Sequence, residues 1–252
     1  MIEVKNLVKS FEHKTVLDDV SCLFEKGKVN LIIGGSGSGK TVFQKCIVGL
    51  FTPDSGTILF DGKDFLKMDK YEKKDVRQDI GMLFQSGALF DSLTVEQNVA
   101  FPLMMFTHLS VSDRRDRANE CIKRVNLENA NKLFPSEISG GMKKRVAIAR
   151  AISNNPKYLF CDEPNSGLDP VTSLVIDYLI KEITEEYNMT TIINTHDMNS
   201  VMENGERIVF LSKGKLRWQG TKDELLTVDN QELNDFIFAT KIMKSLKHLG
   251  HL

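Results

Sequence analysis

The stretch Gly34-Gly35-Ser36-Gly37-Ser38-Gly39-Lys40-Thr41 decides the fold. It matches the pattern G-x-x-x-x-G-K-[ST] between the apolar run 29–33, an expected strand, and a helix expected to open at about Thr41. The glycines let backbone N–H groups converge, and the helix N-terminus adds partial positive charge. The loop is predicted to bind a polyphosphate, with Lys40 on the β and γ phosphates and Thr41 on Mg²⁺. A glycine-rich turn that contains Lys and Thr by chance is the alternative.

Two carboxylates end a second apolar run, Tyr158-Leu159-Phe160-Cys161-Asp162-Glu163. Acids at the end of a buried strand are costly unless a positive group pairs with them. In the template for phosphoryl transfer, Asp162 helps to hold Mg²⁺ and Glu163 orients or deprotonates the attacking water. His196 follows another expected strand, at the edge where open parallel sheets bind ligands. The alternatives are an ordinary acidic turn and a packing or surface histidine.

A second anion site is predicted at Ser139-Gly140-Gly141, which opens a helix that continues through Ile152. A serine N-cap followed by glycines leaves N–H groups and a hydroxyl facing outward. One triphosphate cannot occupy this site and the Lys40 loop unless the two converge. In a two-fold dimer each Ser139 loop would close on the nucleotide held by the other copy's Lys40 loop. A plain helix cap is the alternative.

Apolar runs with little polar alternation indicate buried parallel strands, and they are separated by segments with helix caps. Asp169-Pro170 predicts the N-cap and first residue of a helix that reaches about Tyr187. Strand signals are almost absent from 93 to 153, so we expect an α/β core at 1–92 and 154–228, a helical insertion at 93–153 and a helical extension at 229–252. The predicted strands are 29–33, 80–84, 158–161, 191–194 and 208–211, and the capping-box pairs are Thr94 with Gln97, Ser110 with Asp113 and Thr221 with Glu224.

The composition excludes several classes of protein. The 33 Lys+Arg against 34 Asp+Glu give a formal charge of −1, which argues against a protein that coats nucleic acid. The hydrophobic share of 41% and charged share of 27% are typical of a globular chain. The four cysteines lack the spacing of a metal site, so we expect packing residues of a reduced protein. Without a long apolar run or a secretory signal, the expected location is the cytoplasm.

Together, these motifs resemble the ATP-binding subunit of ABC transporters over nearly the whole chain. The resemblance implies a P-loop NTPase core with a mixed or parallel sheet, antiparallel N-terminal strands and a helical subdomain specific to ABC proteins. It also implies an ATP hydrolase that uses ATP and Mg²⁺ and works as a homodimer on integral-membrane permease subunits. The motifs are a Walker A loop at 34–41, the Q-loop residue Gln85, the signature Ser139-Gly140-Gly141, a Walker B end at Asp162-Glu163, a D-loop at 166–169 and the switch residue His196.

The resemblance assigns a role to each of these residues. Glu163 is implied as the base and His196 as a polarising donor, so that catalysis comes mostly from positioning and charge stabilisation. Phe11 stands where the family places an aromatic that stacks on adenine, although any Phe could be a core residue there. The implied Mg²⁺ ligands are Thr41, Gln85 and Asp162, and the implied nucleotide contacts are Gly34, Gly35, Ser36, Gly37, Ser38, Gly39, Lys40 and Thr41 with Ser139, Gly140, Gly141 and Asp169 across the dimer.

Two details resemble the ATPase of Mla-type lipid transporters: the run 83–90, LFQSGALF, and Met142 in place of the commoner glutamine after the signature. These systems pair the ATPase with a permease and an MCE-domain protein and move phospholipids between bacterial membranes. The resemblance makes the apolar turn 87–90 a socket for the permease, on the inner face of the inner membrane. Packing within the helical subdomain is the alternative for that turn.

Two other functions compete with lipid transport. A soluble ABC ATPase that acts on DNA or ribosomes would carry a long coiled-coil insertion or two cores in tandem, and this chain shows neither. A division-complex ATPase that docks on membrane subunits but transports nothing is separated from a lipid transporter only by the resemblance of 87–90.

The C-terminal segment carries an approximate helical stripe of apolar residues, with lysines on other faces. We expect it to dock on its own domain or on the partner protomer, and contact with anionic lipid or the permease is the weaker hypothesis. The stripe comprises Leu233, Phe236, Ile237, Met243, Leu246 and Leu249, and the lysines are Lys241, Lys244 and Lys247.

Overall fold

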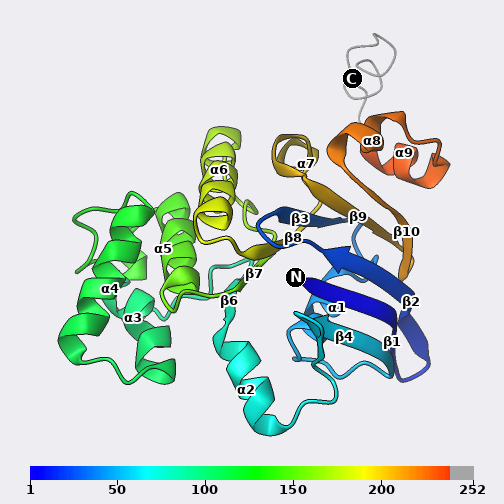
Figure 1. Cartoon of the computed structure of the whole chain (residues 1–252). Helices are drawn as coiled ribbons and strands as arrows, with labels where there is room; N and C mark the ends of the chain where they lie inside the picture. The colour runs from blue at the N-terminus through cyan, green and yellow to red at the C-terminus, as the bar shows by residue number, and fades with distance from the viewer. Residues whose placement is uncertain (239–252) are drawn as a thin grey trace. The chain divides into compact units, whose positions relative to one another are not determined.

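The structure is a computed structural model that describes residues 1–238 (Figure 1). The chain forms two compact units. Among the described residues, the first unit comprises Met1–Glu25, Val29–Leu66 and 194–238, and the second comprises Lys26–Lys28 and Lys67–Ile193. Both units mix helices and strands, so the fold is α/β, as predicted.

The first unit contains a four-stranded antiparallel sheet in the order β2-β1-β4-β5, in which Ile2 on β1 pairs with Phe24 on β2 and with Phe60 on β4. A second group of strands pairs β3 in parallel with β9 and β9 antiparallel with β10. Every residue of β3 is buried, as expected for a strand without polar alternation. The elements are β1 (Ile2–Phe11), β2 (Lys14–Phe24), β3 (Val29–Ile33), α1 (Lys40–Ile47), β4 (Ser55–Phe60), β5 (Lys63–Asp64), α7 (Met198–Asn204), β9 (Arg207–Ser212), β10 (Lys215–Gly220), α8 (Lys222–Thr227) and α9 (Gln231–Ile237).

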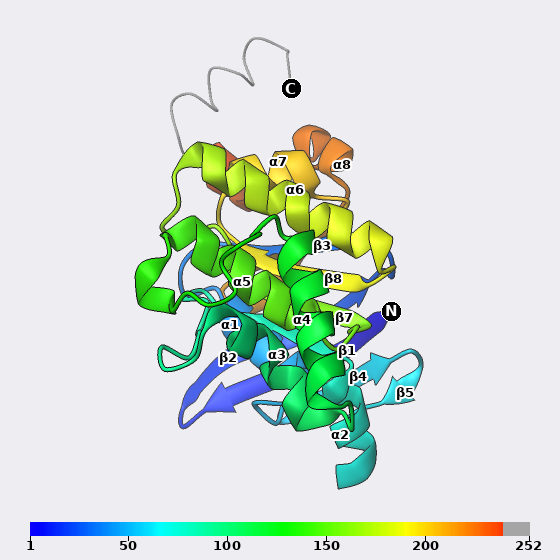
Figure 2. The same cartoon turned by 90° about the vertical axis from the view of Figure 1, so that its left-hand side faces the viewer.

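The second unit combines parallel strands with a cluster of three helices. Strand β6 runs parallel to β7, with Ile80 opposite Tyr158. Helices α3, α4 and α5 pack against one another, and both views show them side by side (Figure 2). The elements are α2 (Lys70–Gln78), β6 (Ile80–Leu83), α3 (Val95–Phe106), α4 (Val111–Arg124), the 3-10 helix η1 (Pro135–Glu137), α5 (Gly140–Ile152), β7 (Tyr158–Asp162), α6 (Pro170–Glu186) and β8 (Thr190–Thr195), whose last two residues belong to the first unit.

The predicted helix caps are present. Thr94 and Thr221 each accept a backbone N–H from the third helical residue, whose side chain bonds back to the cap. Ser110 caps α4, but the predicted capping box with Asp113 does not form, because the Asp113 carboxylate accepts the Ser110 hydroxyl instead of the Ser110 backbone N–H. Asp169 caps α6, which ends at Glu186. The prediction of a strand at 80–84 was wrong by one residue, because the chain turns after Leu83 and the N–H of Gly87 donates to the carbonyl of Phe84 at 2.8 Å.

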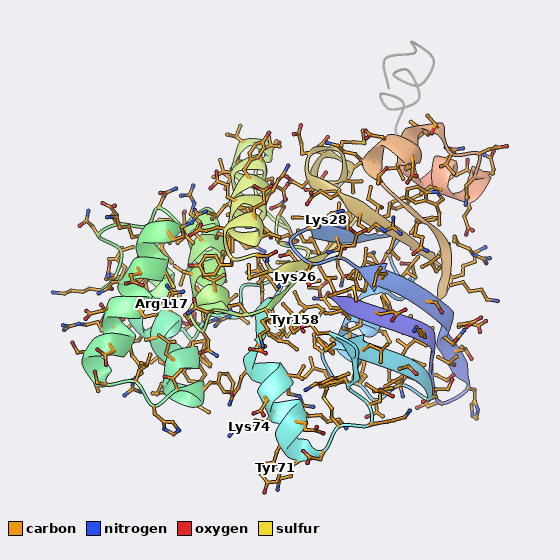
Figure 3. All side chains as sticks on the ribbon, viewed as in Figure 1. Lys26, Lys28, Tyr71, Lys74, Arg117 and Tyr158 are labelled. Atoms are coloured by element: carbon orange, nitrogen blue, oxygen red, sulfur yellow. The ribbon has the colours of Figure 1, made fainter. Side chains whose placement is uncertain are left out.

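Helix α2 contributes little to the packing of its unit. None of its residues is buried, and the side chain of Tyr71 is 68% exposed. Tyr71 and Lys74 project from the helix toward solvent (Figure 3). The capping box of Asp69 and Glu72 therefore stabilises a surface helix with no apolar face.

The described part of the C-terminal stripe packs on its own unit. Leu233 and Ile237 are buried, and the Phe236 ring lies 5.5 Å from the Phe210 ring of β9. The expectation of docking on the chain's own domain is confirmed for these residues. The remaining stripe residues Met243, Leu246 and Leu249 and the lysines Lys241, Lys244 and Lys247 lie outside the described residues.

The four cysteines are buried thiols. Burial raises the pKa of Cys46 and of Cys121 to about 11, so both remain protonated at neutral pH. They are packing residues, as expected. Within residues 1–238, no helix combines the length and the apolar character that crossing a membrane requires.

Candidate active site

The predicted phosphate loop joins β3 to α1 in the first unit. Gly34 has φ 151°, and a Cβ there would lie 2.2 Å from the carbonyl oxygen of Leu211, so no other residue fits. Gly39 has φ 107°, caps α1 without a side chain, and is followed by a first turn that contains no acid. The N–H groups at the start of α1 therefore face no side-chain acceptor from the cap. Lys40 Nζ donates to the carbonyls of Gly34 at 2.7 Å and Gly35 at 3.2 Å, which holds its ammonium over the loop.

The hairpin that carries Phe11 lies against this loop. Leu17, which pairs with Lys9 on β1, would touch a Cβ on Gly39 at 3.0 Å. Phe11 ends β1 and is 39% exposed, with its ring edge-on to Phe51 at 5.3 Å. An aromatic ring with an open surface is thus held on the strand that borders the loop. Its stacking on adenine stays a prediction.

His196 is the first residue after β8 and is exposed. The strand before it is buried throughout, and Thr195 Oγ1 accepts the N–H of Asp197 at 3.0 Å. Asp197 in turn caps α7 by accepting the N–H of Asn199 at 2.9 Å. The His196 imidazole therefore lies on a short segment that is held by the buried strand β8 before it and by the capped helix α7 after it.

In the second unit, the two predicted carboxylates leave the end of β7. Four residues of β7 are buried, Asp162 is half-buried, and Glu163 has φ 49°, a left-handed conformation that is unfavourable for a residue with a side chain. The N–H of Ser166 donates to the carbonyl of Glu163 at 3.1 Å and closes the turn. Backbone strain of this kind gathers at functional sites, because the surroundings must hold it in place.

Gln85 follows β6 and contacts two other predicted motifs. Its Nε2 donates to Ser166 Oγ at 3.2 Å, and its carbonyl accepts from Lys144 Nζ at 2.5 Å. Lys144 is only 6% exposed. Burial lowers the pKa of Lys144, and the nearby Cys161 and Glu163 oppose that shift. Lys144 thus connects the signature helix α5 to the backbone of Gln85 and lies in the electrostatic reach of Glu163.

A second buried cation on α5 holds the turn after Gln85. Arg150 is 8% exposed and donates to the carbonyls of Gly87 at 2.7 Å and Ala88 at 2.8 Å. Ala88 has φ 46°, so this turn is also left-handed at a residue with a side chain. Phe90 follows it, 42% exposed, with its ring 4.6 Å from that of Phe101 on α3. The backbone of the turn 87–90 is therefore held in place by Arg150, and the turn exposes an apolar surface.

The signature residues open α5 as predicted, with one correction. Ser139 Oγ accepts the N–H of Met142 at 3.3 Å, so one of the N–H groups expected to be free is used by the cap. A Cβ on Gly141 would lie 2.9 Å from Thr172 Cγ2, which places the start of α5 against the start of α6. Asp169 accepts hydrogen bonds from the Thr172 hydroxyl at 2.5 Å and from two backbone N–H groups. These bonds, led by that of Thr172, lower the pKa of Asp169.

The predicted residues thus form two groups, one in each unit. Phe11, the loop 34–41 and His196 belong to the first unit, and Gln85, the signature, Asp162, Glu163 and Asp169 belong to the second. No sequence pattern predicted a role for Lys144, Arg150, Gln44 or Asn194. The signal for Arg150 was present, because a charged residue interrupts the otherwise apolar run 146–152.

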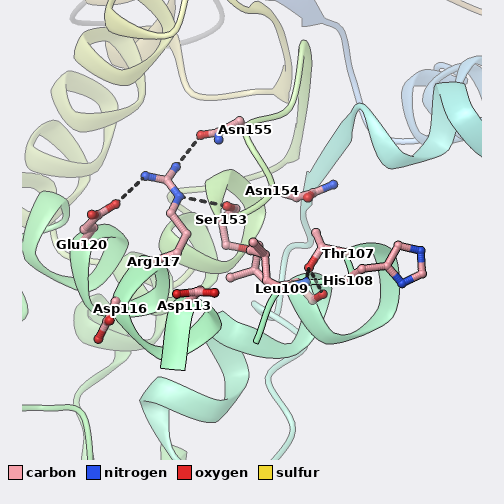
Figure 4. Close-up of a pocket in the computed structure, with 11 residues that line it drawn as sticks. Thr107, His108, Leu109, Asp113, Asp116, Arg117, Glu120, Ser153, Asn154 and Asn155 are labelled. Carbon is pink, nitrogen blue, oxygen red and sulfur yellow. Dashed lines mark hydrogen bonds and ion pairs between the residues drawn. The ribbon is translucent and has the colours of Figure 1, made fainter. Parts of the chain in front are cut away.

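An open pocket on the second unit is lined by none of the predicted site residues (Figure 4). Arg117 crosses it and donates to the carbonyl of Ser153 at 3.1 Å, to Asn155 Oδ1 at 2.5 Å and to Glu120 at 3.1 Å. The bonds to Ser153 and Asn155 tie α4 to the loop after α5. The pocket is lined by Leu103, Thr107, His108, Leu109, Asp113, Asp116, Arg117, Glu120, Ser153, Asn154 and Asn155.

Comparison with known proteins identifies relatives over nearly the full chain. The family model for the ABC transporter matches residues 17–166. The probable ribonucleotide transport ATP-binding protein mkl of Mycobacterium leprae is 39% identical over 96% of this chain and 70% of its own length. The intermembrane phospholipid transport system ATP-binding protein MlaF of Haemophilus influenzae is 39% identical over 94% of this chain and 90% of its own. The methionine import ATP-binding protein MetN 2 of Bacillus cereus is 38% identical over 90% and 68%.

Two solved structures share the fold. A dimeric ATP-binding cassette in a post-hydrolysis state with ADP and phosphate superposes with a TM-score of 0.79 and 35% identity, over 88% of this chain and 99% of that one. The cbiO1 protein of Clostridium perfringens, part of the transporter complex cbiONQ, superposes with a TM-score of 0.84 and 29% identity, over 100% of this chain and 98% of that one.

Proposed function

This chain belongs to the ABC transporter family and is an ATP-hydrolysing subunit of that family, and from this premise we propose that it drives phospholipid transport through a separate membrane permease. The observation that carries the lipid proposal is the 39% identity to MlaF over 94% of the chain. The LFQSGALF run at 83–90 and Met142 support the same assignment. An MCE-domain protein would be the further partner, and the permease would hold the chain on the inner face of the inner membrane.

In the proposed reaction, the first unit binds the nucleotide. Lys40 would move from the loop carbonyls to the β and γ phosphates, because a phosphate is a stronger acceptor for an ammonium than a neutral carbonyl. The start of α1 supplies N–H groups and partial positive charge to the same phosphates. Phe11 would stack on the adenine, and His196 would donate to the γ-phosphate.

The second unit would supply the group that acts on water and two of the three proposed Mg²⁺ ligands, and Thr41 of the first unit would be the third. Glu163 would hold the attacking water and accept its proton, and its left-handed backbone fixes where the carboxylate starts. The donor set suits Mg²⁺, which prefers hard oxygen ligands and keeps waters and substrate phosphates in its shell. Thr41, Gln85 and Asp162 provide a hydroxyl, an amide oxygen and a carboxylate, and Gln85 Nε2 is engaged by Ser166, which leaves its amide oxygen for the metal. Bound Mg²⁺ would neutralise charge on the phosphates.

A homodimer would complete each site. The cap of α5 uses the N–H of Met142, and the remaining first-turn N–H groups and the Ser139 hydroxyl would contact the γ-phosphate bound to the other copy. The dimeric relative with ADP and phosphate supports this arrangement. The helical segment 93–153 would be the subdomain that carries the signature. Asp169, at the N-cap of α6, would transmit closure of the dimer across its interface.

The clamped turn 87–90 is the proposed permease socket. Arg150 fixes its backbone, so that an apolar surface is presented in a defined position. Phe90 rests on α3, and the end of that helix exposes more apolar side chains. The exposed fractions there are 54% for Met104, 57% for Met105 and 43% for Phe106, which is typical of a contact surface rather than of packing within the chain.

Two measurements test the proposal. In light scattering, the Glu163→Gln variant with Mg–ATP should give twice the mass of the nucleotide-free chain, and a monomer even in the presence of its permease would contradict the dimer. Purification of the intact membrane complex, followed by mass spectrometry of retained small molecules, should recover a permease, an MCE-domain protein and phospholipid. Recovery of methionine or ribonucleotides would instead favour the substrates in the names of MetN 2 and mkl. Recovery of peptidoglycan-hydrolase regulators would favour the division-type ATPase.

A further inference from the structure

Two buried side-chain amides join the helix after the phosphate loop to the strand before His196. Asn194 Nδ2 donates a hydrogen bond to Gln44 Oε1, and the two residues are 1% and 2% exposed. Gln44 Nε2 is buried too, and among residues 1–238 the structure shows no acceptor for it. Burying amides in this way is unfavourable, whereas replacing both partners with apolar groups of the same shape is nearly neutral. Stability therefore does not explain the pair.

The position of the pair relates it to the reaction. Gln44 lies one helical turn after Lys40, on nearly the same face of α1. Asn194 lies two residues before His196, at the end of β8. The buried residues beside Gln44 on α1 and the two residues before Asn194 on β8 are apolar, and the buried Thr195 hydroxyl accepts the N–H of Asp197 within its own segment. Apolar contacts have no preferred direction, whereas a hydrogen bond does. Those apolar residues are Phe43, Cys46, Ile47, Ile192 and Ile193.

We propose that Gln44 and Asn194 are positioning residues for ATP hydrolysis, because their amide bond fixes the end of β8 against α1 and so sets the place of His196 relative to Lys40. The inference rests on the role proposed for His196. Transfer reactions that depend on positioning lose up to about a hundredfold in rate for a displacement of about 1 Å. A small slide of the strand along the helix would therefore slow the reaction without preventing nucleotide binding.

The test removes both amides while it keeps the shape of the core. In the double variant Gln44→Met/Asn194→Leu no buried amide remains unpaired, so Tm should stay within about 3 °C of wild type. The turnover number kcat should fall at least fivefold, and KM for Mg–ATP should change by less than threefold. The single variant Asn194→Leu leaves the Gln44 amide without its donor, and its Tm should fall by roughly 3–8 °C.

A purely structural pair gives the opposite pattern. If the double variant recovers both Tm and kcat, with kcat above one fifth of wild type, the inference is wrong. If its kcat stays below that level while Tm and KM are retained, the inference holds. Should this double variant fail to fold, Gln44→Leu/Asn194→Val provides a second packing solution, judged by the same three measurements.

A matched control comes from another buried polar pair. The hydroxyls of Thr184 and Thr191 lie 2.7 Å apart in the second unit, and both are fully buried. Thr184→Val/Thr191→Val should leave kcat within twofold of wild type, and a loss as large as that of the amide variant would overturn the inference. The variant His196→Ala tests the role of His196 separately from the role of the amide pair. If it retains wild-type kcat, the role of His196 fails; if it is inactive while the amide variant is active, only the amide inference fails.

Discussion

Replacing Arg150 with methionine should destabilise the protein by about 3 kcal/mol. The guanidinium is 8% exposed and makes two hydrogen bonds, to the carbonyls of Gly87 and Ala88. Hydrogen bonds to charged groups contribute about 1.5–3 kcal/mol each, and Met would leave the buried Gly87 carbonyl and the more accessible Ala88 carbonyl without this donor. Burial lowers the pKa of Arg150, so removing the charge also relieves a desolvation cost. That relief offsets part of the lost hydrogen-bond energy, so the net destabilisation is expected near the lower end of the sum for the two bonds, about 3 kcal/mol.

Urea unfolding of the full chain, followed by circular dichroism, measures this difference directly. A loss of about 3 kcal/mol corresponds to roughly 6–12 °C in Tm for a chain of this size. Arg145→Met is the matched control on the same helix, because Arg145 is only half-buried and its bonds to the carbonyls of Val125 and Asn126 are longer, at 3.2 and 3.5 Å. The control should cost less than about 1 kcal/mol. An equal loss in the two variants, or a loss below about 1 kcal/mol for Arg150→Met, would refute the clamp.

Three further results are expected. Glu163→Gln should lower ATP turnover far more than threefold, a factor that corresponds to roughly 0.65 kcal/mol, and turnover within that range in a steady-state phosphate assay would exclude it as the base. Gly34→Ala should destabilise the chain by about 2–4 kcal/mol in urea unfolding and abolish ATP binding, because its Cβ would overlap the Leu211 carbonyl; unchanged binding would be inconsistent with the loop geometry. Because hydrogen bonds led by that of Thr172 hold the pKa of Asp169 below its ordinary value of 3.8, the carboxylate contributes stability that is present above that value and is lost as pH falls through the folded-state pKa. Asp169→Asn should therefore show a smaller drop in urea midpoint between pH 5 and pH 3 than wild type, and an unchanged drop would contradict the shift.

Local sequence signals predicted the helix starts well, because a single residue of the right type can form the cap. Thr94 and Asp169 cap their helices as expected, since a cap depends on residues no more than three positions apart. The strand end at Leu83 was misplaced by one residue, because Phe84 suits a strand by its composition and only the turn to Gly87 excludes it. Ser139 shows the same limit, since the sequence placed it at the cap but could not tell how many N–H groups the cap would use.

The sequence by itself determined the phosphate loop, the acidic end of β7, the signature cap and the family, because each is a short pattern in which neighbouring residues fix the chemistry. Only the tertiary structure decided which polar groups would be buried together. Lys144 meets the carbonyl of Gln85 from 59 positions away, Arg150 meets Gly87 from 63, and Gln44 meets Asn194 from 150. A lysine or a glutamine on a helix is ordinarily exposed to solvent. Whether it is buried depends on a polar partner that is distant in sequence and comes near only when the chain folds, so the local sequence does not predict it.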